Sequence, residues 1–192
     1  MTLDALNALD APAAARELRR CCGSTRWADR MTAARPFDSA DAILETGDRV
    51  WRSLDRADWL EAFAAHPRIG DSGAGEAGRA GEAGRAGEAG RAGGAAHGDW
   101  SAGEQAGVAT ATSTIRQRLA AANREYEARF GYIFIVCATG KSADEMLATL
   151  EQRLKNGPDA ELRIAAEEQR KITQLRLTRL LNDRSRSRET RK

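Results

Sequence analysis

Two ionisable side chains, one imidazole and one carboxylate, occur where the sequence could support proton transfer. His66 lies in the segment His-Pro-Arg-Ile-Gly-Asp, where Pro67 restricts the backbone and a glycine permits close approach to a ligand. Because histidine titrates near neutral pH, it can donate and accept protons in acid–base catalysis. The competing interpretation is that His66 only caps carbonyl groups at the end of a helix. The other histidine, His97, lies in a Gly-rich segment, which leaves His66 as the catalytic candidate.

Glu104 is the carboxylate, and its surroundings permit two interpretations. Ser101 precedes it with the Ser-x-x-Glu spacing of a capping box, which satisfies backbone N–H groups at a helix start. Alternatively, this helix start presents its N–H groups and the side chains of Ser101, Glu104 and Gln105 to a polar, anionic ligand. Both interpretations can hold together, so the residue types alone leave the role of Glu104 open.

The remaining candidates favour structural roles when each is taken singly. Arg176 is interpreted as a residue on the solvated face of the last helix, and the apolar run 132–138 as core. Cys137 would act as a nucleophile only with a lowered thiol pKa, and its apolar neighbours favour the opposite. The sequence has no metal-binding Cys/His spacing, no Gly-x-Ser-x-Gly elbow and no P-loop.

Helices are expected to position these residues in the first third of the chain. Apolar periodicity with start and stop signals predicts five helices, at about 3–9, 10–22, 25–34, 39–54 and 55–66. The fourth is expected to bury Ile43, Leu44, Val50, Trp51 and Leu54. In the fifth, Asp55 caps the start and Pro67 ends the helix, so His66 is expected at its C-terminal edge.

Three further helices are expected after residue 100, at about 101–130, 142–155 and 159–182. The run 132–138 between the first two is expected to be an extended, buried segment, because no partner strand is apparent. The last helix carries an apolar stripe of Leu162, Ile164, Ile172, Leu175 and Leu180. The predicted fold is a single all-α domain, an irregular bundle of about eight helices.

Composition excludes several classes of protein. The 192 residues include 30 Lys and Arg against 28 Asp and Glu, and a net charge of +2 gives no field that attracts nucleic acid or an anionic membrane. No run approaches the roughly 18 apolar residues of a membrane-spanning helix, and the N-terminus lacks a secretory signal. Three cysteines, an odd number, do not indicate a disulfide framework, which favours the cytoplasm.

A Gly- and Ala-rich tract interrupts the helical pattern at 72–98. Within it, the sequence Gly-Glu-Ala-Gly-Arg-Ala repeats three times, but it offers no bulky apolar residue that a solenoid could stack. We interpret it as a flexible surface insertion within a domain of residues 1–182. Residues 183–192 form a basic tail that is expected to be disordered.

Six motifs, in order, resemble the OHCU decarboxylase family, OHCU being 2-oxo-4-hydroxy-4-carboxy-5-ureidoimidazoline. One such motif is weak evidence, but six in register over about residues 3 to 182 are specific. They are Cys21-Cys22-Gly23-Ser24 with Trp27, Arg35-Pro36-Phe37, Ala62-Phe63 with His66-Pro67-Arg68-Ile69-Gly70, Trp100-Ser101 with Glu104-Gln105, Phe130-Gly131-Tyr132 with Phe134, and Lys171-Ile172 with Leu175-Arg176-Leu177.

The resemblance implies an all-α, homodimeric enzyme that decarboxylates OHCU to (S)-allantoin without a metal or an organic cofactor. By position, His66 corresponds to the catalytic histidine, and Glu104 and Arg176 to its charged companions. The substrate-binding residues that it implies are Pro67, Ser101, Ala102, Gly103, Glu104, Gln105, Phe134, Ile135, Val136, Cys137 and Ala138. Backbone groups of the last five would bind the heterocycle, so apolar side chains can occupy that stretch.

The chain departs from the family in the insertion between His66 and Ser101, where the family's connection is shorter. Such an insertion is tolerable, because each doubling of loop length costs only about 0.6 kcal/mol of closure entropy. The chain ends without the Ser-Lys-Leu peroxisomal address, which again favours the cytoplasm. Two alternatives remain: a relative that acts on another ureido acid, and a helical module whose basic tail binds a polyanion. Deleting the residues after Asn182 tests the second, because an enzyme would retain turnover.

Overall fold

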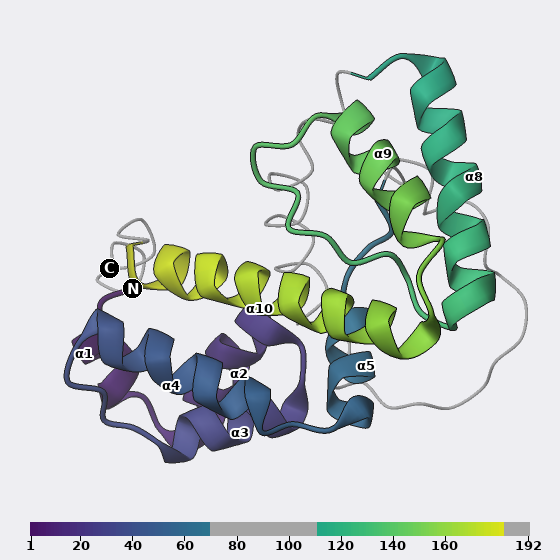
Figure 1. Ribbon diagram of the computed structural model, residues 1–192. Helices are drawn as coiled ribbons and strands as arrows, with labels where there is room; N and C mark the ends of the chain where they lie inside the picture. The colour runs from purple at the N-terminus through teal and green to yellow at the C-terminus, as the bar shows by residue number, and fades with distance from the viewer. Residues whose placement is uncertain (70–110, 183–192) are drawn as a thin grey trace, which may run out of the picture. The chain divides into compact units, whose positions relative to one another are not determined.

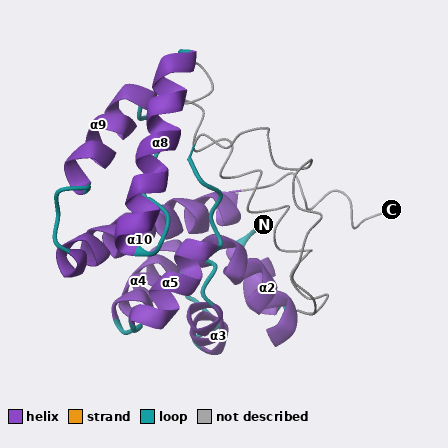
Figure 2. Cartoon of the chain, turned by 90° about the vertical axis from the view of Figure 1, so that its right-hand side faces the viewer, coloured by secondary structure: helices purple, strands orange, loops and turns teal. Residues whose placement is uncertain are grey.

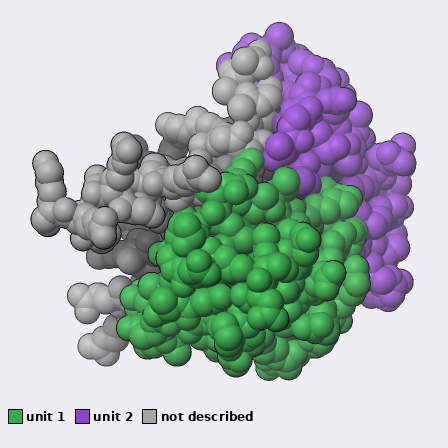
Figure 3. All heavy atoms as spheres, turned by 90° about the vertical axis from the view of Figure 1, so that its left-hand side faces the viewer, with its two compact units in different colours: residues 1–63, 166–192 green, residues 64–165 purple. Residues whose placement is uncertain are grey.

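The computed structural model describes residues 1–69 and 111–182 of the chain. Its contacts divide the chain into two compact units, unit 1 with residues 1–63 and 166–192, and unit 2 with residues 64–165 (Figure 3). The described part holds eight α-helices and no strand (Figures 1 and 2), which confirms the all-α prediction. The helices are α1 (Leu3–Ala8), α2 (Ala11–Cys22), α3 (Thr25–Ala33), α4 (Ala40–Arg52), α5 (Arg56–Ala64), α8 (Ser113–Phe130), α9 (Ala143–Arg153) and α10 (Pro158–Asn182).

Local capping signals determine where the helices of unit 1 start and stop. The side chains of Asp10, Ser24 and Ser39 accept hydrogen bonds from the first turns of α2, α3 and α4, as Ser, Asp and Thr do at helix N-caps. Asp55 does the same for α5 by accepting from two backbone N–H groups of its first turn. Gly23 ends α2 with φ 86°, a left-handed conformation that glycine adopts without steric cost. The predicted boundaries of these helices are confirmed to within a few residues.

Close helix packing builds the core of unit 1. Trp27 of α3 is fully buried, and its Nε1 donates to the carbonyl oxygen of Gly47 on α4 at 3.1 Å. A Cβ on Gly47 would lie 3.2 Å from Cδ1 of Leu177 on α10, which is a tight contact, so the glycine lets the helices approach without displacing that side chain. Trp51 of α4 similarly donates to the Ala166 carbonyl at 3.0 Å. Hydrogen bonds from indole N–H groups therefore stabilise the core together with apolar contacts.

Two helices bury a stripe that differs from the predicted one. Leu44 and Val50 of α4 are only half-buried, whereas Thr46 and Gly47 are buried. On α10, Ile164 is 38% exposed. Successive helical residues are rotated by about 100° around the helix axis. Leu44, one residue after Ile43, and Ile164, two residues after Leu162, therefore point away from the directions in which those buried residues point. The buried stripe of α10 is instead completed by polar residues, namely Gln169, Thr173 and Arg176.

Unit 2 places α8 beside α9, with a buried non-helical segment between them in sequence (Figure 1). The predicted single helix over 101–130 does not continue through Thr112, which has extended backbone angles and caps a helix that begins at Ser113. The start predicted at Ser101 lies outside the described residues. The Thr112 side chain accepts from the Ile115 backbone N–H, as expected of a helix N-cap. Gly131 ends α8 with φ 79°, and Ser142 with Glu145 forms a capping box on α9, both as predicted. Residues 132–138 form neither helix nor strand and are mostly buried, which confirms that prediction.

The insertion at 72–98 and the tail at 183–192 lie outside the described residues. No described helix has both the length and the apolar content that crossing a bilayer requires. Among the described residues, no three His, Cys, Asp or Glu side chains gather in a group that could hold a metal ion.

Candidate active site

His66 follows the end of α5 by two residues and is half-buried, with its Nε2 atom inaccessible to solvent. Its position at the C-terminal edge of the helix is as predicted. The chain immediately after it is held to α8 at two points of unit 2. Arg68 donates to both carboxylate oxygens of Glu127, at 3.0 and 2.9 Å, and Asn123 Nδ2 donates to the Ile69 carbonyl at 3.1 Å. The backbone that carries His66 is therefore fixed on its C-terminal side.

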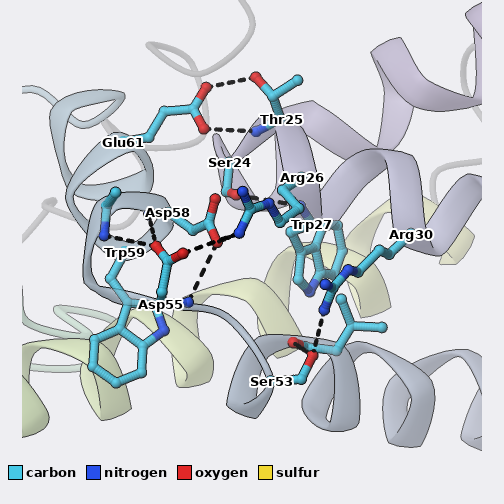
Figure 4. Close-up of polar contacts among 12 residues, drawn as sticks. Ser24, Thr25, Arg26, Trp27, Arg30, Ser53, Asp55, Asp58, Trp59 and Glu61 are labelled. Atoms are coloured by element: carbon cyan, nitrogen blue, oxygen red, sulfur yellow. Dashed lines mark hydrogen bonds and ion pairs between the residues drawn. The ribbon is translucent and has the colours of Figure 1, made fainter.

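His66 follows α5 in the chain. Two carboxylates of α5 bind residues of α3 within unit 1. Figure 4 shows Glu61 and Asp58 of α5 directed toward Thr25 and Arg26 of α3. Glu61 accepts from the Thr25 backbone N–H at 3.0 Å and from its hydroxyl, and so caps the start of α3. Asp58 is buried and accepts from Arg26 at 3.1 Å. These contacts fix α5 along the turns that lead to His66.

The segment Phe134 to Ala138 is the second predicted binding element that the structure describes, and it also contacts α8. The Phe134 ring meets the Tyr126 ring edge-on, with centroids 5.3 Å apart. Tyr126 lies three residues after Asn123, the residue that holds the Ile69 carbonyl. Because positions three apart share one face of a helix, the chain after His66 and the segment 134–138 contact neighbouring positions on α8. Within unit 2, one helix face thus organises two of the predicted binding elements.

Arg176 is fully buried in unit 1, so its interpretation as a solvated surface residue is wrong. Its neighbours on α10 are also polar and buried: Gln169 donates toward the Cys22 carbonyl at 3.5 Å and toward the Thr173 hydroxyl at 3.3 Å. Burying a guanidinium costs free energy unless the group is paired and hydrogen-bonded. Arg170, in contrast, pairs with Asp48 at 2.6 Å on the partly exposed side of the helix.

The other predicted site residues divide between the units and the undescribed part of the chain. His66, Pro67 and Phe134 to Ala138 belong to unit 2, and Arg176 belongs to unit 1. Pro67 is exposed, and Cys137 is half-buried. The stretch of Ser101, Ala102, Gly103, Glu104 and Gln105 lies outside the described residues.

Comparison with known proteins agrees with the motif order in the sequence. The OHCU decarboxylase family model matches residues 7–178. The chain belongs to this family. A crystal structure of OHCU decarboxylase in the presence of (S)-allantoin superimposes with a TM-score of 0.69 at 34% identity, over 88% of this chain and 99% of that one. A crystal structure of (S)-allantoin synthase, 17% identical with a TM-score of 0.63, shares the fold.

Curated relatives include both longer and similar-sized proteins. The uric acid degradation bifunctional protein TTL of Arabidopsis thaliana is 36% identical over 88% of this chain, which spans 48% of that protein. The chain thus covers about half the length of this relative. The 2-oxo-4-hydroxy-4-carboxy-5-ureidoimidazoline decarboxylase of Haloferax volcanii is 26% identical over 92% of this chain and 94% of its own length.

A polar cluster in unit 2 of this family member was not predicted from the sequence. It is formed by the buried side chains of Arg153, Glu161 and Tyr126 and by the half-buried Asn156. Arg153 donates through Nε to Glu161 Oε1 at 2.7 Å, and both side chains are almost fully buried. A signal was present, because Tyr126 continues the buried face of α8, and Arg153 continues that of α9. A count of apolar residues alone does not register a charged residue on a buried face.

Two adjacent thiols of the family's Cys-Cys-Gly-Ser motif are expected to be unreactive in the folded protein. Cys21 and Cys22 are fully buried, and burial raises the pKa of Cys22 to about 12 and that of Cys21 further. The opposing effects are smaller, chiefly a backbone hydrogen bond at Ser24 for Cys22 and the Arg176 charge for Cys21. Because only the thiolate reacts, iodoacetamide at about pH 8 should leave both unmodified in peptide maps. The urea-unfolded protein is the control and should be alkylated at both. Modification of either in the folded protein at the unfolded rate would contradict this.

Proposed function

We propose that this protein decarboxylates OHCU to (S)-allantoin. The match to the OHCU decarboxylase family over residues 7–178 supports this most directly, together with the 34% identical structure obtained in the presence of (S)-allantoin. When the carboxylate bond at the ring carbon breaks, carbon dioxide leaves and the electron pair moves into the adjoining conjugated ring. The substrate itself accepts these electrons, so no organic electron sink is needed. Protonation of the neighbouring ring carbon, with loss of the hydroxyl proton as that group becomes a carbonyl, then completes the product.

In this proposal, His66 delivers that proton to one face of the ring, which makes the product a single enantiomer. His66 is half-buried and closely precedes in the chain the anchored residues Arg68 and Ile69, which supports the role because proton transfer needs a fixed donor. Glu104 sets the protonation state and position of His66. Arg176 holds an anionic group of the substrate, a role for which a permanently charged guanidinium is suited.

Substrate binding is assigned to Pro67, to the stretch Ser101 to Gln105 and to the backbone of Phe134 to Ala138. Backbone N–H and C=O groups recognise the polar edges of a heterocycle as well as polar side chains do. The burial of four of the five residues in the last stretch supports this assignment, since hydrogen bonds strengthen where water is excluded. We further propose that the enzyme is a cytoplasmic homodimer that binds no nucleic acid. Among the described residues, Cys21, Cys22 and Cys137 form no disulfide, which agrees with a reducing compartment.

Turnover of OHCU generated in the assay tests the proposed function. OHCU is formed from urate by the upstream enzymes, and its decay is followed by ultraviolet absorbance while circular dichroism records the handedness of the allantoin. The expected result is faster decay with a single enantiomer, because spontaneous decay gives a racemate. Racemic allantoin formed at the spontaneous rate would exclude OHCU as the substrate and favour a different ureido acid.

A further inference from the structure

We infer that Arg153 is a positioning residue that holds the backbone of Phe134 to Ala138 in its substrate-binding conformation. The inference rests on the proposed function, which assigns substrate binding to this stretch. Arg153 is the last residue of α9 and touches the stretch at two places within unit 2. Its Nη1 donates to the Ile135 carbonyl at 2.7 Å, and its guanidinium lies 4.7 Å from the centroid of the Phe134 ring. One side chain thus holds both a backbone group and an aromatic ring of the stretch.

A fixed carbonyl at Ile135 also fixes the donor on the following residue. The peptide bond between Ile135 and Val136 is planar, and it is not the cis bond that the structure records at Arg35-Pro36. In a trans peptide, the N–H points opposite to the C=O. The Val136 N–H is therefore directed away from Arg153, as a donor for a heterocyclic carbonyl or ring nitrogen should be.

Arg153 can position the stretch because several hydrogen bonds hold its own side chain in place. Its Nε donates to Glu161 Oε1 at 2.7 Å, and its Nη2 lies 3.3 Å from the Tyr126 hydroxyl. Glu161 accepts in addition from the Tyr126 hydroxyl and, at 2.7 Å, from Asn156 Nδ2. Burial holds the pKa of Tyr126 well above its ordinary value, so the phenol stays protonated and remains a donor. The planar fork of arginine serves Glu161 and the Ile135 carbonyl together, which a lysine cannot do.

The Arg153→Lys variant tests the inference, because it keeps the charge beside Glu161 and removes the fork. We expect the KM for OHCU to rise about tenfold and kcat to change by less than about twofold, since the lost contact supports ground-state and transition-state binding equally. The inhibition constant of (S)-allantoin should rise by the same factor as KM. Arg129→Lys is the matched control, because Arg129 also contacts a ring, that of Phe130, and a backbone carbonyl, that of Asn156. That variant should behave as the unmodified enzyme.

Each outcome separates the two proposals. If the unmodified chain does not turn over OHCU, the proposed function fails, whatever the variant does. If the unmodified chain is active and folded Arg153→Lys keeps its KM, or loses only active fraction at constant KM, then Arg153 does not position the binding stretch. Should Arg153→Lys not fold by circular dichroism, Tyr126→Phe decides. It removes one hydroxyl from the cluster and should raise KM about threefold, and an unchanged KM overturns the inference.

Discussion

Replacing His66 with glutamine is expected to lower kcat for OHCU by about 10²- to 10⁴-fold, the usual range for loss of a positioned acid–base group. Glutamine has a size similar to histidine and can hydrogen-bond, so the anchored residues Arg68 and Ile69 should keep their contacts with α8. It does not titrate near neutral pH, and so it cannot deliver the proton after carbon dioxide has left. Residual decay of the substrate should then give allantoin with a large racemic fraction.

Single-turnover decay of OHCU and the optical activity of the product, measured together, check this prediction. His97→Gln provides the matched control, because it removes the other histidine of the chain and should leave both quantities unchanged. A His66→Gln enzyme that forms (S)-allantoin at the unmodified rate would remove His66 from the mechanism. A slow enzyme that still forms one enantiomer would instead assign the stereospecific proton to a different group.

The features of the fold that could be predicted are those with local causes. A serine or aspartate before a periodic apolar run caps the helix wherever the rest of the chain lies, and Asp10, Ser39 and Ser142 do so here. Gly23 and Gly131 end their helices because the left-handed conformation is a property of the residue itself. The start of α8 at Ser113 was not predicted, because a threonine within a helical pattern is compatible with the interior of a helix as well as with its cap.

The buried charges could not be predicted from local pattern. Arg176 and Arg153 occupy positions on the apolar faces of α10 and α9, where hydrophobic periodicity counts them as interruptions. The partners of Arg153 come from other segments: Glu161 lies across the turn between α9 and α10, and Ile135 lies in the segment before α9. Family resemblance made Arg176 a candidate because a motif carries it, whereas Arg153 lies in none of the six motifs. Its place became evident only from the contacts.

Glu161→Gln is expected to lower the free energy of unfolding by about 3 to 5 kcal/mol, because it leaves a buried guanidinium without its countercharge. Glu161 is completely buried and accepts hydrogen bonds from Arg153, Tyr126 and Asn156. An amide offers one oxygen to these donors and turns its own NH₂ group toward them. Glu151→Gln is the matched control in the same unit, since the pair of Glu151 with Arg118 is solvent-exposed and should contribute at most about 1 kcal/mol. Urea unfolding followed by circular dichroism measures both, and equal losses would contradict the prediction.

A double variant separates the stabilising role of the Arg153–Glu161 pair from the positioning role of Arg153. Adding Arg153→Met to Glu161→Gln removes the uncompensated charge, so at least about 1 kcal/mol of the lost stability should return. The Ile135 carbonyl, however, still lacks its charged donor, and the KM for OHCU should remain as high as in Arg153→Lys. Recovery of stability without recovery of KM is expected only if the guanidinium serves the binding stretch as well as the core. If both quantities recover together, Arg153 acts through stability alone.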